Sequence, residues 1–191
     1  MNTLFLLLLV ICLCDDAACT PTCNNQCCRF VEGAPVRLRR LRQDFAVIRD
    51  YYEAEDDLEI ALLDQSIEHS LKSPFGCHAM KNIIDFYLKT VLPTAIANMT
   101  EENKNYKPHI ESIQLIFDQL KNDMIKCKNY FQCKKPFEIT QLNSTYTQME
   151  GKGLNKAIGE LDLLFNFIEM YLGSKRRRQG ANFTSGLAQS N

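Results

Sequence analysis

The last part of the chain carries its clearest hydrophobic pattern. Large apolar residues there recur at alternating steps of four and three, the spacing of one face of an α-helix. These positions are Leu154, Ile158, Leu161, Phe165, Ile168 and Leu172. Other apolar residues lie off that face, at Leu163, Leu164, Phe167 and Met170. A helix that is apolar on most sides must be buried on most sides. The pattern therefore indicates a partner surface, either within the chain or on a second copy of it.

Helical spacing recurs along most of the remaining chain. We predict six helices, over residues 36–56, 58–71, 77–93, 110–127, 137–149 and 154–172. Glycine and proline are sparse, at 8 and 6 residues, which favours helices over strands joined by turns. Residues 20–36 combine cysteines with Pro21, Gly33 and Pro35, and we predict an irregular, disulfide-tied arm there. The fold class predicted from the pattern is all-α.

The first of these helices has a polar ridge beside its apolar face. The apolar face consists of Leu38, Leu41, Phe45, Ile48 and Tyr52. The ridge, one step round the helix, consists of Arg39, Arg42, Arg49, Glu53 and Asp56. On spacing alone, the simplest interpretation of such a ridge is a solvated surface.

The length of 191 residues favours one domain, flanked here by two segments of different composition. Residues Leu4 to Leu13 are almost entirely apolar but too few to span a bilayer as a helix, so we predict a signal peptide over residues 1–19. The helical domain then covers residues 20–173. Residues 174–191 are basic and polar, and we predict a disordered tail there.

The cysteines agree with an extracellular protein. Of nine cysteines, Cys12 and Cys14 fall in or beside the signal segment, and cleavage after Cys19 leaves six. Six cysteines allow three bridges with fifteen possible connectivities, whereas cleavage after Cys14 would leave an odd seventh thiol. Three glycosylation motifs, at Asn98, Asn143 and Asn182, point the same way.

Candidate catalytic or metal-binding chemistry is not recognisable in the sequence. The cysteines lack zinc-site spacing, and no nucleophile-elbow, phosphate-loop or metalloprotease motif occurs. A net charge of −1 gives no overall sign of nucleic-acid binding. We therefore predict no enzyme activity, no metal or other cofactor and no membrane insertion. The basic run Lys175 to Arg178 could be a solvated tail, a binding site for heparin-like sulfated glycans, or a processing site.

Three segments, in order along the chain, resemble the interleukin-10 family of cytokines. The first is the pattern Leu38-Arg39-x-Leu41-Arg42-x-x-Phe45. The second is residues 76–93, GCHAMKNIIDFYLKTVLP, which resembles the cysteine-bearing third helix of that family. The third covers residues 152–171, with KGLNKAIGELD and NFIEMY, and resembles the family's last helix. The similarity extends over roughly residues 27–172.

The resemblance implies a disulfide pattern. Cys27 would pair with Cys127, and Cys77 with Cys133. Cys23 and Cys28 lie outside the family's mammalian pattern, and we predict that they pair with each other.

The resemblance also implies a six-helix cytokine bundle that forms a domain-swapped, intertwined homodimer. Helices one to four of one copy would complete their core with helices five and six of the other, with a hinge near residues 134–137. Such a swap would account for the apolar last helix.

The implied function is that of a secreted, mainly anti-inflammatory cytokine. It would bind a class II cytokine receptor, namely an interleukin-10 receptor α-type chain and then a β-type chain, and activate Janus kinases and STAT factors. The positions that match the family's receptor-binding residues are Arg39, Arg42, Arg49, Glu53, Asp56, Glu59, Lys156, Asp162 and Glu169. The resemblance therefore changes the interpretation of the polar ridge from solvated to receptor-facing.

Two other functions remain as alternatives. A secreted helical module that binds lipid or sulfated glycan would need a monomer with an open pocket or amphipathic surface. A hydrolase with an unrecognised site would depend on His69, His78 or His109.

Overall fold

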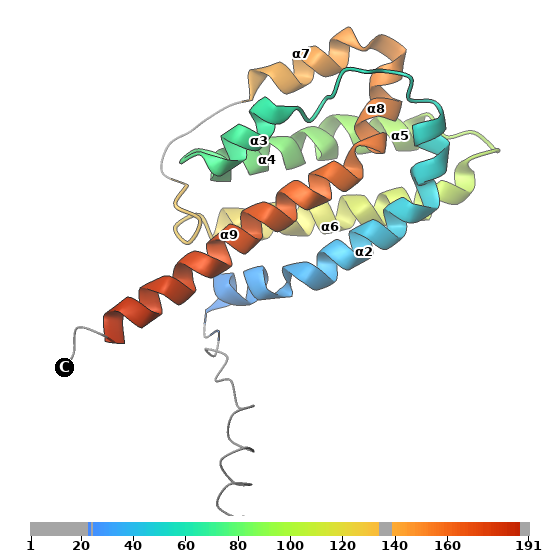
Figure 1. The fold of residues 1–191 in the computed structure, drawn as a ribbon. Helices are drawn as coiled ribbons and strands as arrows, with labels where there is room; N and C mark the ends of the chain where they lie inside the picture. The colour runs from blue at the N-terminus through green and yellow to red at the C-terminus, as the bar shows by residue number, and fades with distance from the viewer. Residues whose placement is uncertain (1–22, 24, 134–138, 188–191) are drawn as a thin grey trace, which may run out of the picture.

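Every regular element in the described part of the chain is helical. The computed structural model describes residues 23, 25–133 and 139–187, with side chains as far as Arg176. The elements are α2 (Gln26–Ala54), α3 (Gln65–Lys72), α4 (Gly76–Phe86), a π-helical turn (Tyr87–Val91), α5 (Leu92–Ala97), a 3₁₀ turn (Lys104–Tyr106), α6 (Lys107–Lys126), α7 (Thr140–Gln148), a 3₁₀ turn (Glu150–Lys152), α8 (Gly153–Gly159) and α9 (Leu161–Leu187). The predicted signal segment, residues 1–19, lies outside the described residues. The long helices α2, α6 and α9 run through most of the length of the molecule (Figure 1).

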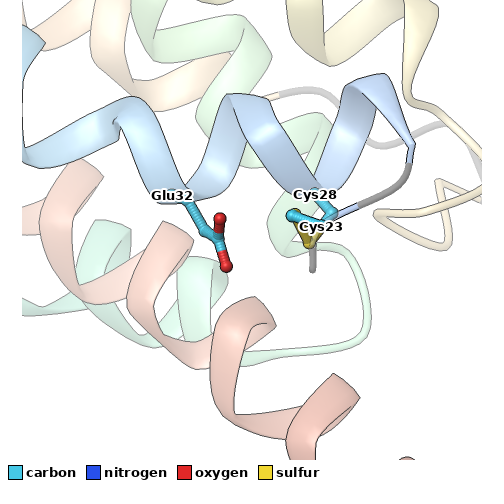
Figure 2. A group of neighbouring side chains, drawn as sticks. All are labelled: Cys23, Cys28 and Glu32. Atoms are coloured by element: carbon cyan, nitrogen blue, oxygen red, sulfur yellow. A yellow bond between two sulfur atoms is a disulfide. The ribbon is translucent and has the colours of Figure 1, made fainter. Parts of the chain in front are cut away.

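Three disulfides connect the described cysteines, two in the pattern that the resemblance implies and the third in the separately predicted Cys23–Cys28 pair. Cys27 at the start of α2 pairs with Cys127 at the end of α6, and Cys77 in α4 pairs with Cys133. The third bridge, Cys23–Cys28, lies at the first turn of α2, on the same side of the helix as Glu32 (Figure 2). The Cys27–Cys127 bridge spans 100 residues of sequence. In the chain-entropy model a loop of that length stabilises the fold by about 5 kcal/mol.

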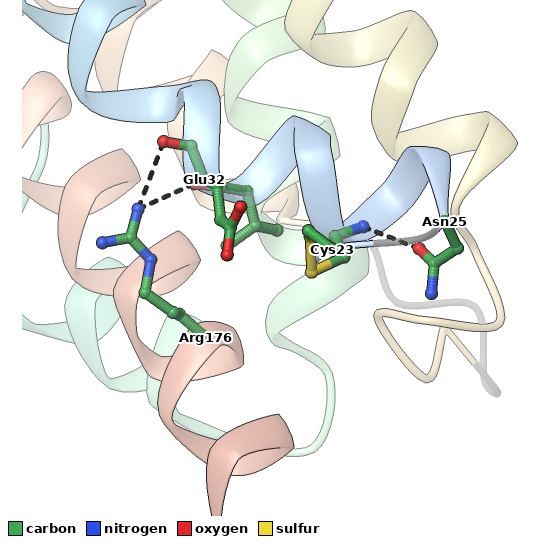
Figure 3. Close-up of a disulfide and its surroundings, with 6 residues drawn as sticks. Cys23, Asn25, Glu32 and Arg176 are labelled. Atoms are coloured by element: carbon green, nitrogen blue, oxygen red, sulfur yellow. Dashed lines mark hydrogen bonds between the residues drawn. A yellow bond between two sulfur atoms is a disulfide. The ribbon is translucent and has the colours of Figure 1, made fainter. Parts of the chain in front are cut away.

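Helix α2 begins at Gln26, so the prediction of an irregular arm up to residue 36 is wrong. Asn25 caps the helix by accepting a hydrogen bond from the amide of Cys28 at 2.8 Å. Pro35 lies inside the helix and has no N–H to offer the carbonyl of Val31. Arg176 of α9 supplies that donor: its Nη2 lies 3.2 Å from the Val31 oxygen and 3.3 Å from the Glu32 oxygen (Figure 3). A contact from a distant part of the chain thus supports the helix across its proline.

Helix α3 is shorter than the predicted helix over 58–71. The side chain of Asp64 caps the start of α3 by accepting hydrogen bonds from the amides of Ser66 and Ile67. The next helix begins close to the end of α3, and a Cβ on Gly76 would lie 2.2 Å from the Leu71 carbonyl oxygen. Pro93 does not end its helix, because it falls in the first turn of α5, directly after the π-helical turn.

The core lies between α2, α4, α6, α8 and α9. Helix α2 packs against α6 on one side and against α8 and α9 on the other. Phe165 of α9 makes edge-to-face contacts with Phe45 of α2 and Phe117 of α6, at ring-centroid distances of 6.0 and 6.3 Å. The buried Tyr87 hydroxyl donates a hydrogen bond to the carbonyl of Ala157, which joins the π-helical turn to α8. Burial raises the pKa of Tyr87 well above its usual value, and the nearby Glu160 charge adds to the shift.

The last two helices complete the core of the same chain. The buried residues of α9 are Leu161, Leu164, Phe165, Phe167, Ile168, Tyr171 and Leu172. Of the apolar residues off the predicted face, Leu164 and Phe167 are buried, whereas Leu163 and Met170 are only partly buried against the core. Their partner surface is present within one copy, because α2 and α3 both contact α9. The apolar character of α9 therefore does not by itself require a second copy. The predicted hinge, residues 134–137, lies outside the described residues.

The predicted last helix is divided and extended in the structure. Glu160, at φ −84° and ψ 8°, separates α8 from α9. Helix α9 then continues past Gly173, where the sequence pattern stops, to Leu187. A glycine costs a helix only about 1 kcal/mol relative to alanine. In the turn that follows Gly173, Lys175 lies over the Tyr171 ring of the same helix at 5.0 Å, and Arg176 holds the turn to α2.

Candidate binding surface

A charged cluster joins the middle of α2 to α9. The guanidinium Nη2 of Arg42 lies 2.7 Å from Glu169 Oε2 and 2.9 Å from Asn166 Oδ1. Its Nε lies 3.9 Å from Asp162 Oδ1. The side chains remain accessible, with exposed fractions of 35% for Arg42, 49% for Asp162 and 55% for Glu169. Exposed ion pairs of this kind contribute little to stability, so these charges remain available to a binding partner.

The same face of α2 carries further charges on either side of Arg42. Arg49 lies over the ring of Phe45, 5.1 Å from its centroid, and its Nε is 3.8 Å from Glu53 Oε1. Arg39 is exposed, one turn nearer the start of the helix. Among the described side chains, Arg39 has no ion-pair partner. This face thus offers three arginines along one side of the helix.

The loop between α2 and α3, residues 55–64, continues this surface. Glu59 and Ile60 are exposed at its tip, and 67% of the Ile60 surface is accessible. Asp57 pairs with Lys152 at 2.5 Å. The hydrogen bond from Lys152 lowers the pKa of Asp57. The tip therefore presents an apolar side chain beside carboxylates.

Lys156 of α8 lies beneath this loop and does not face solvent. Only 9% of the residue is exposed. Its ammonium group donates to the Leu58 carbonyl at 2.9 Å and to Asp56 Oδ2 at 3.2 Å. The loop therefore covers Lys156 in this structure, and a direct contact of Lys156 with a receptor stays a prediction.

Glu160 anchors the other end of the loop and has no counterpart among the predicted site residues. Its two carboxylate oxygens accept hydrogen bonds from the amides of Leu62 and Leu63, at 3.0 and 2.7 Å. The sequence offers only a weak signal for this role, namely the spacing of four residues from Lys156. Asn166, which joins the Arg42 cluster, was also missed because an amide on an exposed helical face gives no signal.

The predicted site residues thus fall into three groups. The structure brings Arg42, Asp162 and Glu169 together, and it pairs Arg49 with Glu53. It pairs Asp56 with the buried Lys156. It places Arg39 and Glu59 in solvent without ion-pair partners among the described residues. Apart from the covered Lys156, they lie on α2, the following loop and α9, so residues distant in the sequence lie on adjoining elements.

Other candidate sites are less convincing. Ligand-type atoms of Cys23, Cys28 and Glu32 lie within 4.8 Å of one another (Figure 2). The two sulfurs are bonded to each other, however, and a disulfide has no thiolate to offer a metal.

A cavity of about 610 Å³ lies between the α3–α4 turn, Phe131 and the Met170–Lys175 part of α9, away from the charged surface. The helices of the described segments include none with the length and apolar character of a membrane span.

The predicted glycosylation sites differ in how far the structure describes them. Asn98 at the end of α5 and Asn143 in α7 are exposed. Asn182 lies in α9, but its side chain falls outside the described part. Occupancy of all three sites stays a prediction.

Comparison with known proteins agrees with this architecture. The family model described as Interleukin 10 matches residues 2–174. Interleukin-10 of Gallus gallus is 35% identical over 175 residues, covering 91% of this chain and 95% of the relative. Interleukin-10 of Felis catus is 30% identical over 155 residues, covering 81% and 85%. Interleukin-10 of Trichosurus vulpecula is 30% identical over 174 residues, covering 90% and 97%.

The disulfide-linked, all-helical architecture agrees with the helical cytokine that the resemblance implies. The chain belongs to the interleukin-10 family. It is a cytokine and not an enzyme. The match to the family model ends at residue 174, so Arg176 and its contact with α2 lie beyond the matched part.

Proposed function

We propose that this protein is a secreted cytokine that binds an interleukin-10 receptor α-type chain through α2, the 55–64 loop and α9. Binding would then recruit a β-type chain and activate Janus kinases and STAT factors, with a mainly anti-inflammatory outcome. Family membership supports the receptor class. Secretion rests on the predicted signal peptide and on the cysteine and glycosylation motifs.

One observation carries the assignment of the surface. The Arg42 cluster combines a cation and two carboxylates from distant parts of the chain, and all three remain accessible. Such a group can exchange its internal pairs for charges on a partner at small cost in fold stability. The exposed Glu59 and Ile60 extend the same face.

We further propose that the cytokine acts as an intertwined homodimer, so that one ligand holds two α-type receptors. Each of the three disulfides found among the described cysteines joins residues on the N-terminal side of the 134–138 linker. None of these three bridges ties α7, α8 or α9 to the rest, so these helices are free to pack onto the equivalent surface of a second copy. The solution mass of the signal-free protein tests this part, and a monomer at nanomolar to micromolar concentrations would contradict it.

The receptor assignment is tested by the double variant Arg42→Ala, Asp162→Ala. Loss of central charged contacts should weaken binding to a purified α-type receptor ectodomain by about a hundredfold. The helical circular dichroism should stay unchanged, since the two side chains are about one-third to one-half exposed. Unaltered affinity in a folded double variant would remove this surface from the proposal.

A matched control uses two charged residues on the long helix α6. Lys107 and Glu111 form an exposed pair on α6 at 3.8 Å. The double variant Lys107→Ala, Glu111→Ala removes one cation and one carboxylate at a distance from the proposed surface. It should leave the α-type receptor affinity unchanged.

A further inference from the structure

The 55–64 loop is held at two points by residues one helical turn apart. Near its start, Lys156 donates to the Leu58 carbonyl and pairs with Asp56. Near its end, Glu160 accepts hydrogen bonds from two successive amides, those of Leu62 and Leu63. Lys156 and Glu160 are themselves 3.6 Å apart. The two side chains therefore form one clamp that joins α8 to both ends of the loop.

The clamp is buried, whereas the part of the loop between its anchor points is exposed. Only 11% of the Lys156 side chain and 12% of the Glu160 side chain are accessible. Leu62 and Leu63 are each 2% exposed, so the loop also inserts apolar side chains beside the clamp. Glu59 and Ile60 lie between the anchors and face solvent. A loop fixed in this way loses little conformational entropy when a partner binds its tip.

We propose that Glu160, supported by Lys156, is a positioning residue for receptor binding. It fixes the loop so that Glu59 and Ile60 present a carboxylate beside an apolar side chain. The matching feature on the receptor is a shallow apolar pocket bordered by a basic residue. This inference rests on the proposed receptor function and adds a specific contact and its support.

The clamp also links loop shape to assembly. Glu160 and Lys156 follow the 134–138 linker in the chain, and the loop precedes it. The clamp therefore holds the loop when the last helices are docked, whether they come from the same copy or from a second one.

The test compares Glu160→Gln with the wild type and with the matched surface variant Glu111→Gln. Glutamine keeps one acceptor oxygen, so one of the two amide hydrogen bonds should be lost. The amides of Leu62 and Leu63 should exchange hydrogen faster, while core amides stay protected. Affinity for the α-type receptor ectodomain should fall about tenfold, mainly through slower association, because a mobile loop binds competently in only a fraction of encounters. Glu111→Gln should change neither measurement.

A second variant keeps the inference testable if Glu160→Gln fails to fold. Ile60→Asp changes an exposed side chain and should leave amide exchange at Leu62 and Leu63 as in the wild type. It should still weaken receptor binding about tenfold or more, by placing a second charge against an apolar pocket.

The outcomes separate this inference from the proposed function. Faster exchange at Leu62 and Leu63 with unchanged affinity would overturn the positioning role of Glu160 in binding and leave the receptor assignment standing. Unchanged exchange in a folded Glu160→Gln would overturn the clamp itself. Unchanged affinity in Ile60→Asp would overturn the proposed contact in the same way. A wild-type protein that binds no α-type receptor would overturn both.

Discussion

Helix α2 has two charged edges that differ in what their charges do. On the edge toward α9, Arg42 and its partners are about one-third to one-half exposed. On the edge toward α6, Asp44 is only 2% exposed. The Asp44 carboxylate contacts Arg40 Nε at 3.0 Å, Ser112 Oγ at 2.6 Å and His109 Nδ1 at 2.9 Å. Both edges look alike in the sequence, as polar residues beside a core stripe.

The difference shows how one helix can serve structure on one side and recognition on the other. A buried carboxylate with three polar partners is strongly coupled to the fold, because losing it leaves those partners without their acceptor. An exposed cluster exchanges its partners readily, since water screens its ion pairs. The α6 edge should therefore respond to mutation in stability, and the α9 edge in binding.

The largest effect is expected for Asp44→Ala on the buried edge. Removing the carboxylate should lower the free energy of unfolding by about 3 kcal/mol, because Arg40, Ser112 and His109 lose a shared partner. Urea unfolding followed by circular dichroism measures this. The control is Asp50→Ala, an exposed carboxylate on the same helix, which should change stability by less than about 0.5 kcal/mol. Equal effects in the two variants would remove the distinction between the edges.

A smaller effect, on binding alone, is expected for Glu169→Ala on the exposed edge. Receptor affinity should fall about tenfold, equivalent to about 1.4 kcal/mol, with the unfolding free energy changed by less than about 0.5 kcal/mol. Surface plasmon resonance at two salt concentrations checks the prediction. The wild type should lose more affinity at high salt than the variant, since screening weakens the charge that the variant lacks. A variant that is destabilised but binds normally would reverse the roles assigned to the edges.

The hydrogen bond from Arg176 of α9 to α2 differs from the contacts of both edges, because it joins a side chain to the helix backbone. Arg176→Met removes it. Loss of the donor to the Val31 carbonyl should cost about 1 kcal/mol of stability. In a Pro35→Ala background, the introduced alanine supplies its own N–H to that carbonyl, so the same substitution should cost much less. A double-mutant cycle on the two positions measures this coupling. Additive effects would show that Arg176 does not compensate for the proline.

At neutral pH Tyr52→Phe should give the smallest effect on stability, and at alkaline pH it tests the burial of the core. Burial, with smaller contributions from the charges of Tyr51 and Tyr106, raises the pKa of Tyr52 from 10.0 to about 12. The unfolded chain releases this proton near pH 10 while the native protein retains it, so stability is lost as pH rises from 10 to 12. At about pH 11 the wild type should have lost about 1.4 kcal/mol more than Tyr52→Phe, relative to about pH 8. Parallel pH profiles from urea unfolding would contradict the assignment.

Some elements could be read from the sequence because their causes are local. The stripes of α2, α6 and α9 follow from helical periodicity, and the buried faces agree with them. Other features depend on contacts that local patterns do not contain. The start of α2 was placed too late because Pro35 suggests a break, and its compensation comes from Arg176. The end of α9 was placed too early for a related reason, since Gly173 and the basic run give no sign of that contact.

The binding surface divides in the same way. The sequence placed Arg42, Asp162 and Glu169 among the candidates through their resemblance to a family pattern, and the structure brings them together. It also proposed Lys156 as a contact residue, which the loop covers. Glu160 was missed, because two backbone amides nearly a hundred residues away define its role.

The all-α class, the apolar surface that the last helix must bury and the supply of charges along α2 all follow from the amino-acid sequence alone. These properties depend on residue type and spacing, which the chain carries everywhere along its length. Only the folded molecule determines which of these charged residues are buried and stabilise the fold, and which are exposed and can contact a partner. That distinction depends on which distant atoms exclude water from each side chain, and Lys156 and Glu169, both charged residues of the last helices, received opposite environments for this reason.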